Sequence, residues 1–193
     1  MVRGAKHRRS IRLRGYDYSQ PGAYFVTICT QNRLSVFGRI ADGKMILDEP
    51  GAIANCEWKI LDQRFPQIEL DEYIIMPNHI HGIIIITDTV GAIHELPIHP
   101  SDIENGLQPD VTEENSPAIR RRMTLPRVIG FYKMNSAKAI NIALETPGKH
   151  RWQRNYYEHI IRNNDSLNRI RRYIHQNPSQ WSNDSENPNH ANR

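Results

Sequence analysis

The stretch His79–Thr87 (HIHGIIIIT) constrains the fold more than any other part of this 193-residue chain. Successive side chains of a strand point to opposite faces, and isoleucines here occupy both faces. An apolar run of this length is typical of a buried strand and is far too short to cross a membrane. We therefore predict a central strand of a sheet whose two faces are both covered.

The remainder of the chain supplies partners for this strand. Alternating β-branched and aromatic residues predict three further strands, at Tyr24–Gln31, Leu70–Met76 and Trp152–Arg162. The ADG turn predicts a small hairpin between Val36–Ile40 and Lys44–Leu47. Helical periodicity predicts helices from Pro50 to Phe65, from a Thr124 cap to Leu144, and over Leu167–Gln176 behind a cap at Asp165 or Ser166. The order predicts an α+β fold, a ferredoxin-like antiparallel sheet with packed helices.

The length suits one domain, and composition marks its boundaries. We expect a basic N-terminal arm over 1–15, a single domain over 16–181 and a polar C-terminal tail over 182–193 that frays. A long acidic loop is expected at 88–117, because this segment has four prolines, seven acidic residues and no Lys or Arg.

Basic residues gather at the start of the chain, midway and near its end. Solvated surface explains most charge runs, but three separated clusters favour a polyanionic partner, nucleic acid above all. The candidate DNA-binding residues are Arg8, Arg9, Arg12, Arg14, Arg121, Arg122, Arg127, Lys133, Arg154, Arg171 and Arg172.

The sequence has no signal-peptide pattern and no apolar run that predicts a membrane span. Cys29 and Cys56 have no metal-binding or redox spacing, so we predict two reduced core cysteines and a cytoplasmic protein.

His79 and His81 stand two residues apart, so a strand presents both imidazoles on one face. Two neutral imidazoles side by side suit a divalent metal. The alternative is a pair of hydrogen-bonded histidines at a strand end. The preceding Pro77 and Asn78, in a basic protein, favour metal ligation, which requires further ligands.

Tyr173 and Asn177 stand four apart, hence on one face of the last helix. The amide oxygen of Asn177 would suit Mg²⁺ or Mn²⁺ as a third ligand. Tyr173 would then lie beside the metal as a nucleophile, although its spacing fits a core tyrosine equally well. Tyr132, Tyr156 and Tyr157 are rival nucleophiles with poorer partners.

Two blocks, MPNHIHGIIII and WQRNYYEHIIRNNDSLNRIRRYIHQNP, resemble the signature motifs of REP-associated tyrosine transposases. These are single-tyrosine HUH endonucleases related to insertion-sequence transposases. YDYSQPGAYFVTICTQNR also fits, so the resemblance covers about 16–181. It implies that His79, His81 and Asn177 bind the metal and that Tyr173 is the nucleophile.

The resemblance also implies cleavage of single-stranded or hairpin DNA, such as palindromic extragenic repeats, with tyrosine left on the 5′ phosphate. The acidic loop is longer than this family leads us to expect. A hairpin-binding module without catalysis and a water-activating metal hydrolase remain alternatives, and monomer and homodimer are both open.

Overall fold

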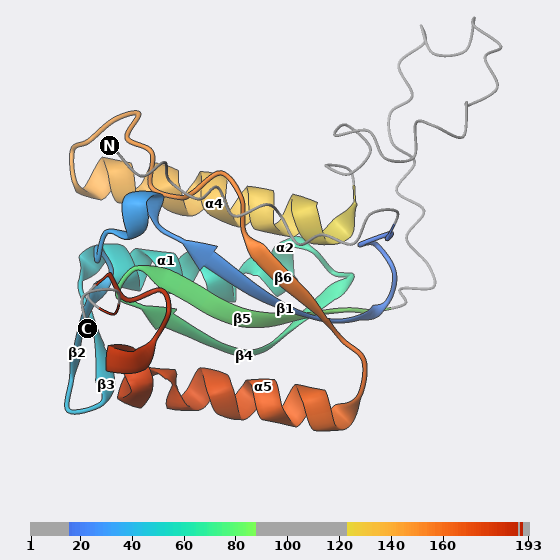
Figure 1. The fold of residues 1–193 in the computed structure, drawn as a ribbon. Helices are drawn as coiled ribbons and strands as arrows, with labels where there is room; N and C mark the ends of the chain where they lie inside the picture. Colours follow the sequence, from blue (N-terminus) through green and yellow to red (C-terminus); the bar gives the residue numbers. More distant parts are fainter. Residues whose placement is uncertain (1–15, 88–122, 189, 191–193) are drawn as a thin grey trace, which may run out of the picture.

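The isoleucine-rich strand β5 (His79–Ile86) lies between two others in a four-stranded antiparallel sheet (Figure 1). The computed structural model describes residues 16–87, 123–188 and 190. Within them the sheet order is β4 (Ile68–Met76), β5, β1 (Gly22–Cys29) and β6 (Tyr157–Ile161). The predicted central strand is therefore confirmed.

Helices and strands alternate along the chain as a ferredoxin-like fold requires. β1 is followed by α1 (Glu49–Lys59) and the short α2 (Leu61–Arg64), then by β4 and β5. α4 (Thr124–Ala143) precedes β6. This β-α-β-β-α-β order, with the first and last strands paired side by side, confirms the predicted α+β class.

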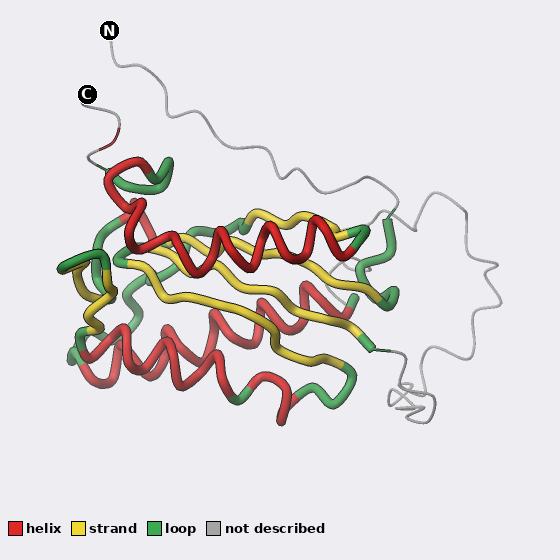
Figure 2. The backbone as a smooth tube through the Cα atoms, turned by 90° about the horizontal axis from the view of Figure 1, so that it is seen from below, coloured by secondary structure: helices red, strands yellow, loops and turns green. Residues whose placement is uncertain are grey.

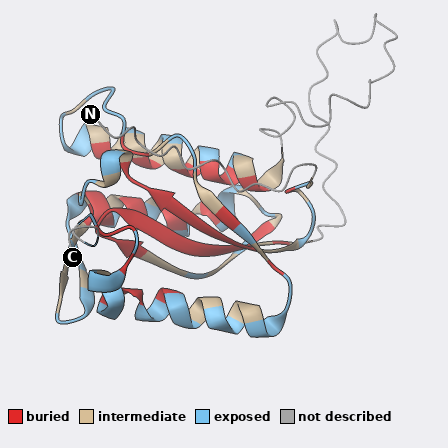
Figure 3. Ribbon diagram, in the orientation of Figure 1, coloured by how far each residue is buried: buried red, intermediate tan, exposed pale blue. Residues whose placement is uncertain are grey.

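Helices cover both faces of the sheet, as Figures 1 and 2 show. α1 and α4 lie on one face, while α5 (Asn164–Gln176) lies across the other. The strands between them are mostly buried (Figure 3). Ile80, Ile84 and Ile86 belong to the core under α1 and α4, and Ile83 belongs to the smaller core under α5.

Gly82 of β5 allows a tryptophan to lie directly on the sheet. Its missing side chain faces α1, where a Cβ atom would come within 2.4 Å of the Trp58 ring. Trp58 is fully buried, and its ring meets that of Tyr132 edge-on. The glycine after the histidine pair is therefore a packing requirement.

Two helix starts differ from the predicted caps. Thr124 is the first residue of α4 rather than its cap, and its N–H donates to the hydroxyl of Ser19. α5 begins earlier than predicted because Asn163 caps it, accepting a hydrogen bond from the N–H of Ser166. A cap supplied by a residue distant in sequence, as at Ser19, leaves no local signal.

The last strand is shorter than predicted. Trp152 forms only an isolated bridge with Thr30, and its indole N–H donates to Ser136. The predicted hairpin is present as β2 (Gly38–Ala41) and β3 (Lys44–Leu47), paired with each other but not with the main sheet.

The chain after α5 does not fray at Ser182 as expected. A 3-10 helix, η4 (Asn177–Asn183), leads into a segment in which Asp184, Glu186 and Asn187 are buried. Ion pairs and hydrogen bonds, described below, hold this polar segment against the end of the sheet.

The predicted basic arm 1–15 and acidic loop 88–117 lie outside the described residues. Within the described part, no helix combines the length and apolar character needed to span a membrane. Neither Cys29 nor Cys56 forms a disulfide in the described part of the chain, but only Cys29 is buried, so the prediction of two core cysteines is wrong for Cys56.

Candidate active site

The two imidazoles of His79 and His81 meet at the start of β5, on the face that α5 covers. Both side chains are buried, and their Nε2 atoms lie 3.0 Å apart. The predicted side-by-side pair is therefore present. Both rings direct their Nε2 atoms toward one point, and a metal ion would bind there.

Asn78 fixes the tautomer of His79. The Asn78 amide nitrogen donates to two backbone carbonyls, of Arg33 at 3.1 Å and of Glu186 at 2.7 Å. Its oxygen must therefore be the atom that lies 2.8 Å from His79 Nδ1. Nδ1 consequently carries the proton and Nε2 presents a lone pair, the arrangement in which histidine binds metals.

Burial keeps both imidazoles neutral. It lowers the pKa of His79 to about 3, with a further contribution from the Arg33 charge. Burial and the neighbouring His79 also lower the pKa of His81, against an opposing effect of Asp184. Thr27, on the adjacent strand, lies 2.8 Å from His81 Nδ1 through its hydroxyl. At neutral pH the two Nε2 atoms need a proton or a cation between them.

Asp184 brings a carboxylate to the same point. Its Oδ2 lies 3.8 Å from His79 Nε2, is buried, and has no hydrogen-bond partner among the described residues. One donor atom each from His79, His81 and Asp184 lies within 4.8 Å of the others, so these residues could hold a metal ion. No spacing or periodicity in the sequence points to Asp184, an acidic residue within a polar tail.

A hydrogen-bonded cluster holds Asp184 in place. Arg33 forms an ion pair with Glu186 at 3.0 Å, and the Cys29 thiol donates to the same carboxylate at 3.3 Å. The N–H of Glu186 in turn donates to Asp184 Oδ1 at 2.6 Å. One carboxylate oxygen is thus fixed by the backbone, which leaves the other directed at the histidines.

Tyr173 projects from α5 onto the histidine pair. Its hydroxyl lies 3.2 Å from His81 Nε2, and its ring meets that of Phe25 edge-on. Burial of the hydroxyl raises its pKa to about 12, as does the Asp184 charge. The residue as a whole is nevertheless 46% exposed, so the predicted nucleophile lies beside the predicted metal ligands and is accessible from outside.

Asn177 lies one helical turn after Tyr173, at the C-terminal end of α5. It is buried, and its Oδ1 has no hydrogen-bond partner in the described part of the chain. A hydrogen bond that the Asn177 side chain donates to the Tyr173 hydroxyl opposes the rise of the Tyr173 pKa. An unpaired buried amide oxygen fits the predicted role of Asn177 as a ligand, which remains a prediction.

The rival tyrosines lie elsewhere. Tyr132 belongs to α4 and is fully buried, on the opposite face of the sheet, where its hydroxyl donates to the Ala54 carbonyl of α1. Tyr156 packs against that same core, and Tyr157 contacts Phe25 rather than the histidines.

The predicted DNA-binding residues are dispersed. Arg8, Arg9, Arg12, Arg14, Arg121 and Arg122 lie outside the described residues. Arg127 and Lys133 belong to α4, across the sheet from Tyr173, and the ammonium of Lys133 donates to the Arg154 carbonyl. Arg171 and Arg172 belong to α5, where Arg171 is paired with Asp71 and Arg172 is exposed beside Tyr173.

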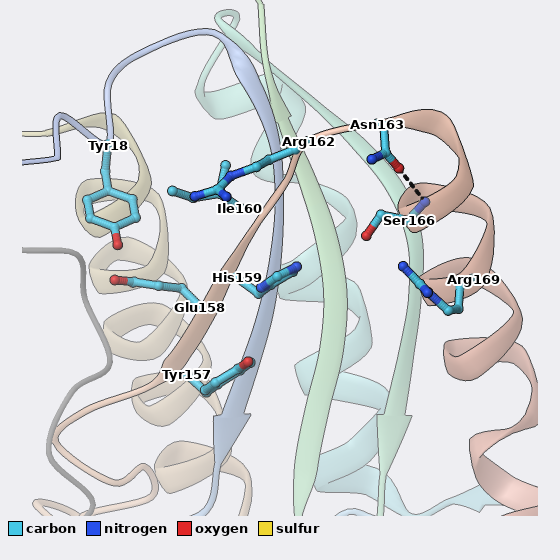
Figure 4. A pocket seen from close by; sticks show the side chains of 9 residues that line it. All are labelled: Tyr18, Tyr157, Glu158, His159, Ile160, Arg162, Asn163, Ser166 and Arg169. Atoms are coloured by element: carbon cyan, nitrogen blue, oxygen red, sulfur yellow. Dashed lines mark hydrogen bonds between the residues drawn. The ribbon is translucent and has the colours of Figure 1, made fainter.

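A pocket of about 420 Å³ lies along the edge strand β6 and the start of α5, apart from the histidine pair. His159 from β6 and Arg169 from α5 extend toward each other there (Figure 4). Arg162 also lines it, so two arginines outside the candidate list line a concave surface of the molecule.

No family model matches the sequence. An uncharacterized protein of Haemophilus influenzae is 38% identical over 181 residues, which cover 94% of this chain and 93% of that protein. Among solved structures, a REP-associated tyrosine transposase bound to a REP hairpin superposes with a TM-score of 0.53 at 16% identity. This superposition covers 92% of this chain and 74% of the other.

The structural likeness confirms the resemblance at the level of the fold, which is transposase-like. The sequence likeness extends over nearly the whole of both proteins. This chain therefore belongs to the same family as the Haemophilus influenzae protein.

Proposed function

We propose that this protein is a metal-dependent transposase-like enzyme that nicks and rejoins single-stranded, hairpin-forming DNA through Tyr173. The observation that carries the proposal is the distance of 3.2 Å between the Tyr173 hydroxyl and His81 Nε2. A partly exposed tyrosine at a buried histidine pair fits a nucleophile better than a core residue, because the strand to be cut can reach it.

The reaction we propose is a transesterification. The Tyr173 oxygen attacks the phosphorus of a bound phosphodiester and forms a Tyr–O–P bond as the P–O3′ bond breaks. The phenol proton passes through water to the departing 3′ oxygen, which leaves a 5′-phosphotyrosine and a free 3′-OH. Reversal of the same step by a 3′-OH rejoins the strand.

The residues present fit a divalent cation such as Mg²⁺ or Mn²⁺. His79 and His81 offer neutral nitrogens, and Asp184 and Asn177 offer buried oxygens without hydrogen-bond partners among the described residues. Oxygen ligands from Asp and Asn favour hard cations over a closed structural zinc site. A cation held there supplies positive charge that polarises the phosphate and favours loss of the tyrosine proton.

The chain's own residues prepare the nucleophile. Phe25 supports the Tyr173 ring edge-on, which fixes where the hydroxyl points. A pKa of about 12 keeps the phenol protonated at neutral pH in the metal-free protein. The tyrosine is therefore held back from reaction until substrate and cation are both in place.

The DNA partner is proposed on the strength of the neighbour's hairpin and of this chain's basic residues. We further propose that 16–181, with the docked segment that contains Asp184, act as one catalytic domain in the cytoplasm. Arg172 is exposed on α5 and directly precedes Tyr173 in the sequence, so we propose that it contacts the strand.

A trapping experiment tests the proposal. The protein is incubated with Mn²⁺ and a labelled DNA hairpin that carries single-stranded flanks, then denatured. We expect a covalent adduct that Tyr173→Phe abolishes and that the matched variant Tyr157→Phe, on the same face of the sheet, retains. Peptide mapping should locate the DNA on Tyr173.

Two other outcomes select the alternatives. Binding of the hairpin by the protein without cleavage would indicate a binding module. Cleaved DNA ends without a covalent adduct would indicate a hydrolase that activates water. DNA attached to another tyrosine would show that Tyr173 is not the nucleophile.

A further inference from the structure

Trp181 differs from the other two tryptophans of the chain. Trp58 and Trp152 are buried in the core, whereas Trp181 lies on η4 and is partly exposed. Its ring centroid lies 6.0 Å from that of His79, with 37° between the two planes. The polypeptide therefore places an accessible indole directly beside the candidate metal ligands.

The histidine pair is flanked by aromatic rings at both imidazoles. Trp181 lies beside His79, and the Tyr173 ring lies 5.2 Å from the ring of His81. Both flanking residues are partly exposed, while the imidazoles between them are buried. A phosphate that reached the histidines would therefore have an aromatic surface on each side.

The backbone holds Trp181, so its ring is not needed as an anchor. The Trp181 carbonyl accepts hydrogen bonds from the Asn187 side chain at 2.8 Å and from the Asp184 N–H at 3.2 Å. The indole N–H has no partner among the described residues. The segment would thus stay in place with the ring exposed, which leaves the ring available to a ligand.

We infer that Trp181 stacks on a nucleobase of the single strand next to the phosphate bound at the histidine pair. Stacking on an aromatic residue tolerates every base and contributes about 1–3 kcal/mol per base. The inference rests on the proposed DNA substrate but requires neither cleavage nor Tyr173 as nucleophile. It assigns to η4 the task of positioning the strand.

Intrinsic fluorescence tests the inference directly, because the two other tryptophans are buried. Oligothymidylate is titrated into the wild-type protein in EDTA, so that no strand is cut, while anisotropy of a label on the DNA reports binding. We expect saturable quenching of the tryptophan emission. Trp181→Phe should remove this quenching, and Trp181→Leu should weaken binding about 10-fold.

An abasic oligonucleotide of the same length is the matched control, since it keeps the phosphates and lacks the bases. It should cause no quenching, and Trp181→Leu should not change its affinity. Unchanged Mn²⁺ affinity in Trp181→Leu would show that the histidine site is intact.

Binding of oligothymidylate without quenching would overturn the inference, as would wild-type affinity in Trp181→Leu. An absence of oligothymidylate binding would overturn it as well. The trapping experiment on Tyr173 can succeed in each of these cases, so the two failures are distinguishable.

Discussion

Arg171 of α5 contacts the Asp71 carboxylate of β4 through two nitrogens, with Nε 2.9 Å and Nη2 2.7 Å from Oδ2. Asp71 lies in an irregularity of β4, where the pairing register with β5 shifts between Leu70 and Tyr73. Such bulges redirect a side chain from its regular face. Because Arg171 precedes Tyr173 by two residues, this ion pair holds the tyrosine-bearing helix against the edge of the sheet.

Loss of that ion pair should loosen α5. We expect Asp71→Asn to lower the free energy of unfolding by about 1 kcal/mol, the upper end for a partly exposed pair with good geometry. Urea unfolding measures the change. The double variant Asp71→Arg with Arg171→Asp should recover part of the lost stability. The control is Arg172→Ala, because Arg172 has no ion pair among the described residues, and this variant should not change the free energy of unfolding.

The hydroxyl of Thr27 should support metal binding through His81. Thr27→Val keeps the shape of the side chain and removes the hydrogen-bond partner of His81 Nδ1. Loss of such a supporting contact typically weakens metal binding by about 10–100-fold. Calorimetric titration with Mn²⁺ measures it, with His79→Ala as the reference for lost binding.

Thr30→Val is the matched control, because the Thr30 hydroxyl donates to the Leu34 carbonyl and does not contact the histidines. Equal Mn²⁺ affinity in Thr27→Val and wild type would mean that His81 does not depend on this contact.

Acid should destabilise the metal-free protein through His79. Its pKa is about 3 in the folded state and 6.5 when exposed, so the unfolded chain binds an extra proton between these values. The contribution of His79 to the free energy of unfolding is therefore fully present above pH 6.5 and is lost as the pH drops toward 3. His79 alone contributes a loss of about 2 kcal/mol between pH 6.5 and pH 5.

Chemical unfolding in EDTA across this range measures the slope. His79→Asn should flatten it, while replacement of the exposed His175 by Gln should leave it unchanged. A wild-type stability that does not change between pH 6.5 and pH 5 would contradict a neutral, buried His79.

Salt should weaken DNA binding, because bound phosphates release counterions. Arg172 is exposed on the α5 face, so Arg172→Ala should reduce the slope of log affinity against log salt by about one. Lys59→Ala, at the end of α1 on the opposite face, should leave the slope unchanged. Equal slopes for wild type and Arg172→Ala would remove Arg172 from the DNA contact.

The fold was predictable because the spacing of apolar residues follows the strand period in the sheet and the helix period in the helices that cover it. The isoleucine run predicted the central strand, and the helical stripes predicted α1 and α4. The misjudged boundaries depended on tertiary contacts, such as the Ser19 hydroxyl at the start of α4. Local sequence carries no record of a partner so far away in the chain.

The candidate site was predictable only where spacing encodes it. His79 and His81 share a face by strand geometry, and Tyr173 and Asn177 share one by helix geometry. Asp184 reaches the site through an ion pair between Arg33 and Glu186, residues that are 153 positions apart in the numbering. No periodicity in a polar segment predicts such a contact.

The contact between Gly82 and Trp58 decides which face of the sheet carries the candidate active site. Isoleucine occupies positions 80 and 83–86, so hydrophobicity alone scarcely distinguishes one pairing register of β5 from its neighbour. A shift by one residue would turn every side chain over and direct the imidazoles into the helical core. A side chain at position 82 would clash with the Trp58 ring, so the register in which Gly82 faces this ring is the one that can pack. Two residues on the opposite side of the sheet thus set the orientation of the histidine pair, although neither belongs to the candidate site.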